Sequence, residues 1–410
     1  MRVVVIGAGL AGLTAALAAA ERGHEVTLAS FGVGGLPISP GVIDVLGYAP
    51  DRVERPLSRL GSLPETHPYS RLGETAVREG IAFLRGVLGD SLVGDGETNW
   101  VLPTAVGAMR PTLLAQPSMV AGACTDGAEF AIVGVRQLKD FWPELIAGNL
   151  SRTPTPDSGE VSARPAWVDA PARPGEVDAT GVALARQLDR PDARAEFAAA
   201  LARVTDPRET VGVPAILGVK DAGAHADLEE RADRRIFEIP LPPPSVPGLR
   251  LHQKLWKACA TAGVRLILGS AVDGFEESGR RLSSVTIGTA GHPTKLPADA
   301  VVHAGGGFSA GALQLDSHGV LSETIFGLPL VGVPDEPFVE DARAEQPVFA
   351  AGVDTDGQSR PVDASGEPVY TNLFAAGDIL AGAQRWREKS GDGIAVASAW
   401  LAATQIGGSR

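Results

Sequence analysis

The sequence predicts an α/β fold: a parallel sheet assembled from separate stretches of the chain, with an inserted α+β domain. Three observations support this prediction. The first thirty residues read as strand, glycine-rich turn, helix and strand, and two further apolar strands run into glycines near residues 305 and 377. The chain also has 410 residues, which is too long for one small domain.

The opening segment gives the clearest pattern. Apolar, mostly β-branched residues at 2–6 predict a strand, the alanine-rich stretch 10–22 predicts a helix, and 25–29 predicts a second strand. Residues 3–20 carry no charge, which superficially resembles a signal peptide or a membrane anchor. The spaced glycines within this stretch favour a buried strand–turn–helix instead.

The turn between the first strand and the helix contains Gly7, Gly9 and Gly12 in the pattern G-x-G-x-x-G. The first glycine makes the tight turn, the second lets backbone amides approach phosphate oxygens, and the third lets the helix pack close to the sheet. Leu10 and Ala11 lie at the helix N-terminus, where unpaired amides and the helix dipole favour an anion. We therefore expect a Rossmann-like site that binds the phosphate of a nucleotide cofactor.

One element of that pattern is missing. About twenty residues beyond the glycines, an Asp or Glu normally binds the hydroxyls of an adenosine ribose. Here the second strand runs into Ser30 and Phe31, and Glu25 lies too early, at the start of the strand. Three interpretations remain: the ligand is FMN, which has no adenosine; Ser30 or the backbone replaces the carboxylate; or the site has decayed. We favour FMN, with FAD as the second choice.

A second glycine motif follows an apolar strand at 372–376. The strand leads into Gly377 and Asp378. At the tip of a strand, the aspartate can bind a ribityl hydroxyl while the glycine lets the chain pass a phosphate. We therefore predict that Gly377 and Asp378 contact the cofactor.

The last predicted helix, 394–403, is opened by Gly391, Asp392 and Gly393. The N-terminus of a helix carries partial positive charge. Such an end can stabilise negative charge on the N1–C2=O edge of a reduced flavin ring, so these three residues are further cofactor candidates.

A third apolar strand, 300–303, runs into a glycine-rich stretch that begins with Gly305, as if the chain turns back beneath a cofactor. His303 ends this strand. A lone histidine on an apolar strand is more often a core histidine with its polar atoms satisfied than a catalytic group. We therefore place Gly305, and not His303, in the cofactor site.

The character of the chain changes between these motifs. Residues 151–181 are dense in Pro, Ser, Ala and Gly and predict a linker or surface excursion. Residues 240–247 hold five prolines and predict a rigid, extended crossing. The predicted flavin-binding domain comprises 1–50, 248–320 and 365–410, and the predicted cap or substrate domain comprises 51–247 and 321–364.

Charge and cysteine content exclude several classes of function. The 36 basic and 49 acidic residues give a net charge of −13, which argues against a nucleic-acid partner because phosphate binding needs a basic face. Cys124 and Cys259 lie far apart and no CxxC occurs, so neither a Cys-ligated cluster nor a structural zinc is expected. We expect no metal site, and two buried thiols in a cytoplasmic protein.

Together and in this order, the glycine motifs resemble the superclass of flavoprotein disulfide reductases and fumarate reductases. More narrowly, the chain from Met1 to about Thr404 resembles the B-subunit family of anaerobic glycerol-3-phosphate dehydrogenase. The Pro-Pro-Ser sequence at 243–245 and the Phe-Gly-Leu sequence at 326–328 are the most specific pieces. The stretches that carry the resemblance are 37–46, 241–251, 306–311, 325–328 and 372–378.

The resemblance implies an FMN-type flavin subunit with two partners: a homologous A subunit, which contains FAD, and an iron–sulfur C subunit, which is membrane-attached. Such a complex oxidises sn-glycerol 3-phosphate to dihydroxyacetone phosphate and passes electrons toward quinone. The resemblance also implies a cytoplasmic protein that lies at the inner face of the cell membrane through its partners. The chain departs from the family at His303, where a small apolar residue is usual, and at Lys389-Ser390, where other members often have Gly-Cys.

A phosphorylated alcohol needs a cation for its phosphate and a general base at its carbinol. The substrate candidates are Arg250, which belongs to the proline-rich crossing, His252 and Arg385; Arg110, Lys254 and Arg387 also lie in or near the motif-bearing segments. The sequence does not identify a catalytic base. Two other functions remain open: an electron-relay or structural subunit whose flavin never meets substrate, and a stand-alone dehydrogenase similar to fumarate reductase.

Overall fold

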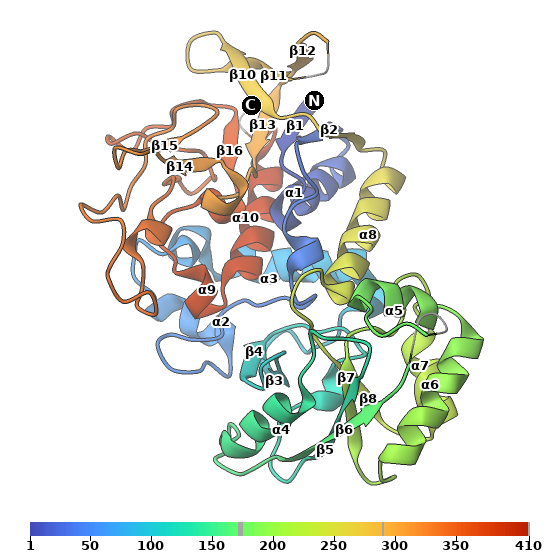
Figure 1. Ribbon diagram of the computed structural model, residues 1–410. Coiled ribbons are helices and arrows are strands. Elements are labelled where there is room, and N and C mark those ends of the chain that lie inside the picture. Colours follow the sequence, from blue (N-terminus) through green and yellow to red (C-terminus); the bar gives the residue numbers. More distant parts are fainter. Residues whose placement is uncertain (171–174, 289–290, 409–410) are drawn as a thin grey trace. The chain divides into compact units, whose positions relative to one another are not determined.

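The computed structural model describes residues 1–170, 175–288 and 291–408 (Figure 1). Contacts divide the chain into two compact units. Unit 1 comprises Met1–Gly35, Asp44–Gly89 and Lys254–Arg410, and unit 2 comprises Leu36–Ile43 and Asp90–Gln253. The division differs from the predicted domains, because residues 51–89 and 321–364, which were expected in the cap, belong to unit 1.

Unit 1 is built on a five-stranded parallel sheet with the strand order β16-β13-β1-β2-β9. β1 lies in the middle and pairs with β2 on one side and β13 on the other, so that Val3 faces both Val26 and Ala300. The predicted parallel sheet, discontinuous in sequence, is confirmed. Its strands are β1 (Arg2–Ile6), β2 (Glu25–Ser30), β9 (Arg265–Leu268), β13 (Ala300–His303) and β16 (Leu373–Ala375).

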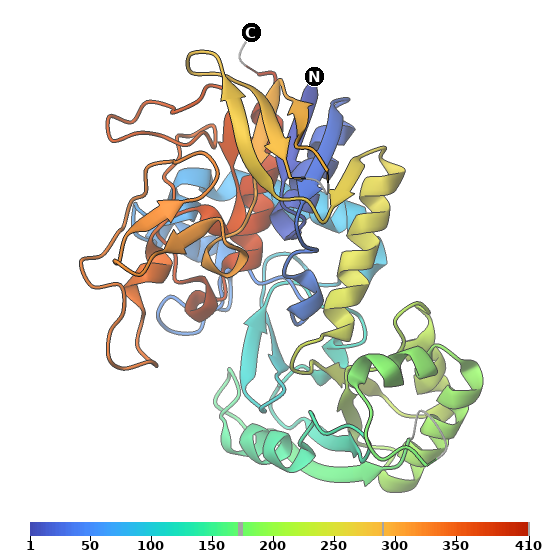
Figure 2. The same cartoon turned by 45° about the horizontal axis from the view of Figure 1, so that its top comes forward.

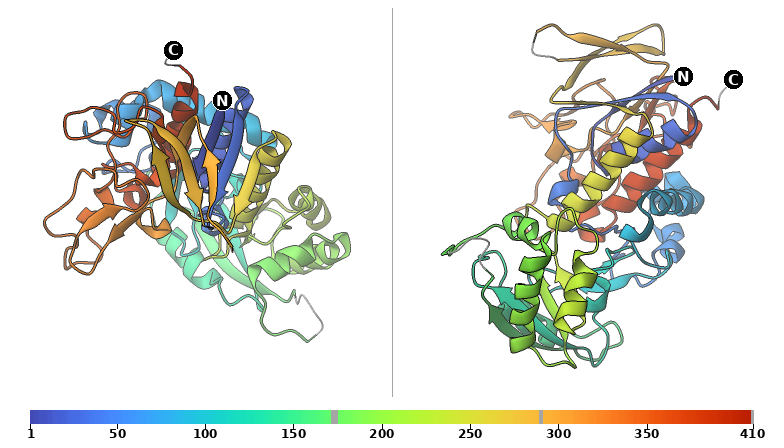
Figure 3. Two further views of the ribbon diagram at one scale, coloured as in Figure 1. Left: turned by 90° about the horizontal axis from the view of Figure 1, so that it is seen from above. Right: turned by 90° about the vertical axis from the view of Figure 1, so that its right-hand side faces the viewer.

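Three helices of unit 1 pack together: α1 (Leu10–Glu21), α3 (Pro68–Leu88) and α10 (Gly391–Gln405). α10 contacts both of the others, and Figure 3 shows it alongside α1. α1 and α10 are rich in alanine and are buried around most of their circumference, because small side chains allow helices to approach closely. At the crossing with α3, a Cβ on Gly80 would lie only 3.1 Å from the Cα of Ala397.

The remaining elements of unit 1 are smaller. The predicted meander forms a separate three-stranded antiparallel sheet, drawn in yellow to orange at the top of Figure 2. Its strands are β10 (Val272–Glu277), β11 (Leu282–Ile287) and β12 (Thr294–Pro297). A hairpin, β14 (Leu313–Leu315) and β15 (Leu321–Glu323), and two short helices, α2 (Pro56–Arg59) and α9 (Arg385–Glu388), complete the unit, and α8 (Val246–Thr261) carries the chain into it from unit 2.

Unit 2 has its own four-stranded sheet, in the order β6-β5-β7-β8, and its own apolar core. All strand pairs within this sheet are parallel, and unit 2 also has a separate antiparallel hairpin. The elements are β3 (Trp100–Pro103), β4 (Met109–Thr112), β5 (Glu129–Val135), α4 (Pro143–Arg152), β6 (Ser162–Val168), α5 (Gly181–Leu188), α6 (Pro191–Val204), β7 (Thr210–Pro214), α7 (Ala224–Ala232) and β8 (Ile236–Ile239).

Short 3-10 helices interrupt the connecting segments of the chain. They are η1 (Leu36–Ile38), η2 (Leu60–Ser62), η3 (Gly89–Ser91), η4 (Val120–Gly122), η5 (Phe308–Ala310), η6 (Pro347–Ala350) and η7 (Gly377–Ile379).

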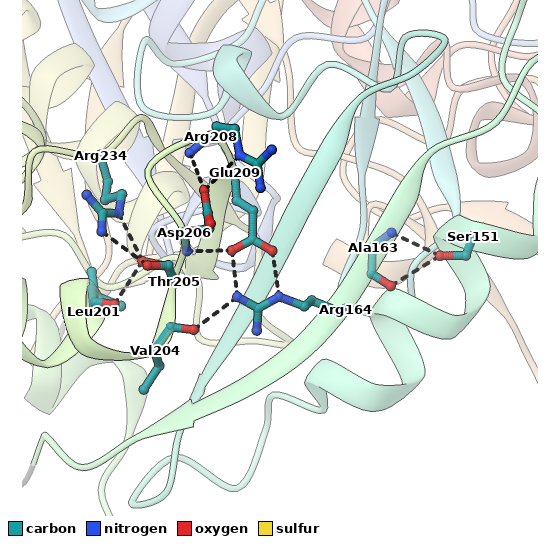
Figure 4. A network of polar contacts seen from close by, with 10 residues as sticks. All are labelled: Ser151, Ala163, Arg164, Leu201, Val204, Thr205, Asp206, Arg208, Glu209 and Arg234. Atoms are coloured by element: carbon teal, nitrogen blue, oxygen red, sulfur yellow. Dashed lines mark hydrogen bonds and ion pairs between the residues drawn. The ribbon is translucent and has the colours of Figure 1, made fainter.

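The stretch predicted as a linker, 151–181, contains strand β6, and residues 171–174 of it lie outside the described residues. β6 is held in place by Arg164, whose Nε and Nη2 each donate to a carboxylate oxygen of Glu209 at 2.5 Å (Figure 4). Nη2 also donates to the Val204 carbonyl at 3.0 Å. These paired hydrogen bonds tie β6 to the connection between α6 and β7, so that a strand forms here despite the loop-like composition.

Two further expectations concern membranes and thiols. In the part of the chain that the structure describes, no helix has the length and apolarity needed to cross a bilayer. Cys124 and Cys259 are both free and buried, as the sequence predicted. Burial raises the pKa of each thiol to about 12, which leaves both protonated and unreactive near neutral pH.

Candidate functional site

The glycine turn joins β1 to α1, and the protein's own backbone explains two of its glycines. Gly7 has a φ of +102°, and a Cβ there would overlap the carbonyl oxygen of Ala304, just beyond β13. A Cβ on Gly12 would overlap the carbonyl oxygen of Gly7. These two positions therefore exclude side chains for reasons of packing, whether or not a ligand is bound.

Packing within the protein does not explain the glycine at position 9. It is the N-cap of α1 with an extended backbone, no side chain caps the helix, and a Cβ there would meet no protein atom within 4 Å. The first turn of the helix carries no acidic residue, and the side chains of Leu10 and Ala11 are buried. The first amides of a 12-residue helix therefore lie beside open space, and this arrangement fits a phosphate group.

The segment after β2 returns to this turn. Gly34, with a φ of +75°, lies so close that a Cβ on it would be 2.5 Å from the Cα of Gly9. Ser30 donates its hydroxyl hydrogen to the Gly32 carbonyl at 2.7 Å. Residues 30–35 contain no carboxylate, so the structure presents no acidic group at the end of β2.

The other two strand-end motifs reach the same sheet edge, where β13 and β16 end. A Cβ on Gly307 would lie 2.6 Å from the Asp378 carboxylate. Gly377, with a φ of +84°, lies so near the start of α1 that a Cβ on it would be 2.8 Å from the Ala11 Cβ. The amide of Gly377 donates to the Ser398 hydroxyl at 2.9 Å. The structure therefore brings the glycines after β13, which begin with Gly305, and the Gly377–Asp378 pair to the glycine turn.

The start of α10 is fixed by the segment that follows residue 43. The amide of Gly393 donates to the Asp44 carbonyl at 2.8 Å, and the amide of Asp44 donates to the Asp392 carboxylate at 3.2 Å. A Cβ on Gly393 would overlap the Tyr69 hydroxyl oxygen, which explains that glycine by packing. A Cβ on Gly391 would lie 3.6 Å from the Cβ of Arg385.

A buried histidine that the sequence did not single out helps to hold this helix start. His67 caps α3: its Nδ1 accepts from the Tyr69 amide at 3.1 Å, and its Nε2 lies 3.1 Å from Oε2 of Glu388. Glu388 also accepts from the Ser390 hydroxyl at 2.7 Å. Burial by itself would raise the pKa of Glu388, but the hydrogen bonds from His67 and Ser390 outweigh it, so the pKa lies below its ordinary value. Both ring nitrogens of His67 are engaged, so it positions α10 and does not act as a base.

His303 is also a core residue with both nitrogens engaged, as predicted. Its side chain is fully buried, with Nε2 at 3.0 Å from Glu323 and Nδ1 accepting from the Gly305 amide at 3.4 Å. Glu323 also accepts amides of the Ile325–Leu328 segment, and its pKa is lowered by His303 although burial alone would raise it. The pair therefore fixes the end of β13 at the glycine-rich edge.

The three substrate candidates are committed to contacts within the protein. Arg250 donates to both oxygens of Glu238, at 2.6 and 3.0 Å, and to the carbonyls of Leu217 and Gly218. Arg385 lies 3.2 Å from Asp378 and also donates to the Leu380 carbonyl. Burial lowers the pKa of His252, in α8. Arg250 and Arg385 thus hold the fold, and only Arg385 lies beside a predicted cofactor residue.

Unit 2 contains a pocket of about 190 Å³. Most of its lining is apolar, and the polar lining comes from Arg110, Thr104, Thr112 and Glu238. The carboxylate of Glu238 is fully used by Arg250, Ser118 and the Leu217 amide. The other lining residues are Pro40, Val42, Leu102, Pro103, Ala105, Met119, Pro240, Leu241 and Pro242.

Comparisons with known proteins identify the family. A Halobacterium salinarum protein, named as a probable B subunit of anaerobic glycerol-3-phosphate dehydrogenase, is 33% identical over 414 residues, covering 98% of this chain and 96% of that protein. The B subunit of the Yersinia enterocolitica anaerobic glycerol-3-phosphate dehydrogenase is 30% identical over 419 residues, with 98% and 97% covered. A family model described as "FAD binding domain" matches residues 2–394. The chain belongs to this B-subunit family of FAD-binding proteins.

Membership in the B-subunit family confirms the resemblance and the fold class drawn from the sequence, and it makes the chain a flavin-binding oxidoreductase. The family model names FAD, so it does not support FMN as the first choice. Among solved structures, a 3-ketosteroid delta1-dehydrogenase from Sterolibacterium denitrificans is similar, with 12% identity, a TM-score of 0.45, and 100% and 99% of the two chains covered.

Proposed function

We propose that this chain is the flavoprotein subunit of a quinone-linked glycerol-3-phosphate dehydrogenase, which oxidises sn-glycerol 3-phosphate to dihydroxyacetone phosphate. The observation that carries the proposal is the similarity, over nearly the full length, to relatives named as the B subunit of such an enzyme. The partners in this proposal are an A subunit, which contains FAD, and a membrane-attached iron–sulfur C subunit. This chain would then lie at the cytoplasmic face of the membrane through those partners.

The residues assembled at the sheet edge support flavin binding. The amides of Gly9, Leu10 and Ala11 would bind the phosphate, and the Asp378 carboxylate would accept a ribityl hydroxyl. A bound flavin supplies hydride acceptance from a carbinol carbon and transfer of the electrons onward. The N-terminus of α10, where Asp392 accepts the Asp44 amide, would stabilise negative charge on the flavin ring.

We infer that the flavin is FMN, and the end of β2 is the observation that supports this choice. Ser30 donates to its own loop, and residues 30–35 offer no carboxylate for an adenosine ribose, which favours FMN against the name of the family model. We expect acid extraction of the purified protein to release FMN. Chromatography of the extract distinguishes FMN from FAD. Stoichiometric FAD would show that Ser30 or the backbone binds the adenosine ribose.

If this chain itself contacts the substrate, the pocket of unit 2 is the site that we propose. Arg110 supplies a cation for the phosphate, and the hydroxyl of Thr104, whose oxygen accepts the Ala108 amide, can donate its hydrogen to a glycerol oxygen. A second candidate function is electron relay without a substrate site. It is favoured by a specific observation: the cations of Arg250 and Arg385 are already paired with Glu238 and Asp378.

Anaerobic titration with glycerol 3-phosphate separates the two candidates. We expect the visible flavin band of the purified chain to bleach, and we expect Arg110→Ala to raise the substrate concentration for half-bleaching by about tenfold or more, because an ionic contact to phosphate is lost. The matched control is Arg190→Ala, which removes an exposed arginine outside the pocket. Bleaching that requires addition of the A subunit would support the relay function, and bleaching by neither route would refute the proposed enzyme.

A further inference from the structure

An exposed apolar surface lies on unit 1, on the segment 331–349 and the adjoining helix α9. We call it the 331–349 surface. The segment is drawn in orange in Figure 1, between β15 and the last strand, and it has no regular structure apart from η6. Its large apolar side chains are strongly exposed, from 39% to 57%: Val331, Val333, Phe338, Val339 and Phe349, with Trp386 of α9 at 48%.

This surface is held in one conformation by its own buried residues. Gln346 is 9% exposed; its side-chain amide donates to the Asp341 carbonyl at 3.0 Å and accepts from the Val339 amide at 3.0 Å. The Val348 amide donates to the Pro337 carbonyl at 3.0 Å. A segment that exposes phenylalanines while fixing its backbone is pre-organised for binding, because less conformational entropy remains to be lost on association.

Helix α9 is tied to the same segment. Arg387 donates to the Arg343 carbonyl at 2.9 Å, and its guanidinium lies over the Trp386 ring, 5.3 Å from the centroid. The side-chain amide of Gln384 donates to the Gln346 carbonyl at 3.1 Å. Helix α9, which carries Trp386, is therefore tied to the segment that carries the phenylalanines, and aromatic and arginine side chains are enriched in protein–protein interfaces.

The charges around the apolar side chains define the occupant. Residues 331–349 contain one basic residue, Arg343, and five acidic ones, which are Asp335, Glu336, Glu340, Asp341 and Glu345. Helix α9 adds two arginines and one glutamate, so the surface has six acidic and three basic residues and stays acidic, although Arg343 and Arg387 pair with Asp341 and Glu345. A symmetric contact with a second copy would bring these carboxylates together, which is unfavourable. An anionic membrane surface would repel them as well. A protein surface with lysines and arginines around an apolar hollow is complementary both to the exposed apolar side chains and to the acidic charges.

We propose that the 331–349 surface is the docking site for a partner subunit with such a basic-rimmed apolar hollow. The inference rests on the proposed function, in which this chain works with the A and C subunits. It adds the surface through which the chain joins them. Phe338 and Trp386 are its apolar anchors, and Glu340 and Asp341 are its complementary charges.

The test uses this chain co-expressed with the A and C subunits of the same organism, and measures assembly by co-purification and by the dissociation constant of the isolated subunits. We expect Phe338→Ser/Val339→Ser and, separately, Trp386→Ser to weaken assembly by at least about tenfold. Glu340→Lys/Asp341→Lys should weaken it and reduce its salt dependence. The matched controls are Val320→Ser and Trp142→Ser, each 58% exposed but outside the surface, and Glu79→Lys for charge reversal; these should assemble as wild type.

The Phe338→Ser/Val339→Ser variant should keep wild-type flavin absorbance per chain, which shows that a loss of assembly is not a loss of the fold. Equal assembly of variants and wild type would overturn the docking surface while leaving the proposed function intact. A wild-type chain that binds neither partner would overturn both. Binding to phosphatidylglycerol vesicles, or a dimer in sedimentation velocity, that disappears in the Phe338→Ser/Val339→Ser variant would assign the surface to a membrane or to a second copy and would also refute the proposal.

Discussion

Gly9→Val is expected to give a folded protein that contains no flavin. The Gly9 backbone is extended, with φ −76° and ψ −174°, and a Cβ there meets no protein atom within 4 Å, so valine fits the polypeptide. The same Cβ enters the space beside the first amides of α1, where we place the phosphate. Absorbance of the purified variant in the visible flavin band should fall to background while its circular dichroism matches wild type.

Two other glycines make this prediction sharper. Gly12→Val places its Cβ on the Gly7 carbonyl, so we expect an insoluble or unfolded product and not a colourless folded one. Gly61→Val has open space around it and lies outside the site, so it should purify with full colour. A yellow, fully loaded Gly9→Val protein would show that the phosphate does not bind at this turn.

Removing Arg250 should produce the largest loss of stability. Arg250 neutralises Glu238, whose side chain is 0% exposed, and Arg250→Ala would leave that carboxylate buried without its counter-charge. Breaking a buried ion pair in this way costs about 3–5 kcal/mol. Urea denaturation followed by tryptophan fluorescence should therefore show a much lower midpoint for the transition of unit 2.

Acid should reproduce part of this loss. Burial alone would raise the pKa of Glu238, but Arg250, Ser118 and the Leu217 amide together lower it below its ordinary value of 4.5. A depressed folded-state pKa means that the contribution is complete above pH 4.5 and is lost as the pH falls through the lower, folded-state pKa. The control is Arg190→Ala, which breaks a solvent-exposed pair with Asp192 and should change neither the midpoint nor its pH dependence. An Arg250→Ala protein as stable as this control would refute the structural role of the pair.

The first βαβ unit could be predicted to within one residue, because it depends on local pattern: β-branched strands, spaced glycines and an alanine-rich helix. Two strands of unit 2, β6 and β8, could not be predicted in this way. β6 contains Pro165, which argues against a central strand, but β6 lies at the edge of its sheet, where a missing amide is tolerated. β8 carries Glu238, a charge that fits a buried strand only because Arg250 neutralises it.

Some residues of the candidate site could likewise be predicted from the sequence, and others could not. Glycines at strand ends mark the sheet edge in the sequence itself, so Gly7, Gly305 and Gly377 could all be found without a structure. His67 could not, because its partner Glu388 lies 321 residues away and neither residue belongs to a recognisable motif. The substrate candidates failed for a related reason: Arg250 and Arg385 have the right chemistry and neighbourhood, but their partners inside the protein are visible only after folding.

The position of β1 has a consequence for how the molecule is made. β1 lies between β2 and β13, so β1 must wait during synthesis for a partner strand nearly 300 residues downstream. At about 5–20 residues per second, translation leaves one edge of β1 unpaired for roughly 15–60 s. The main sheet of unit 2 is complete much earlier, since its strands lie between residues 129 and 239. Nascent chains should therefore depend on chaperones that shield this apolar edge, and the glycine-rich sheet edge is completed only after β16 has been made.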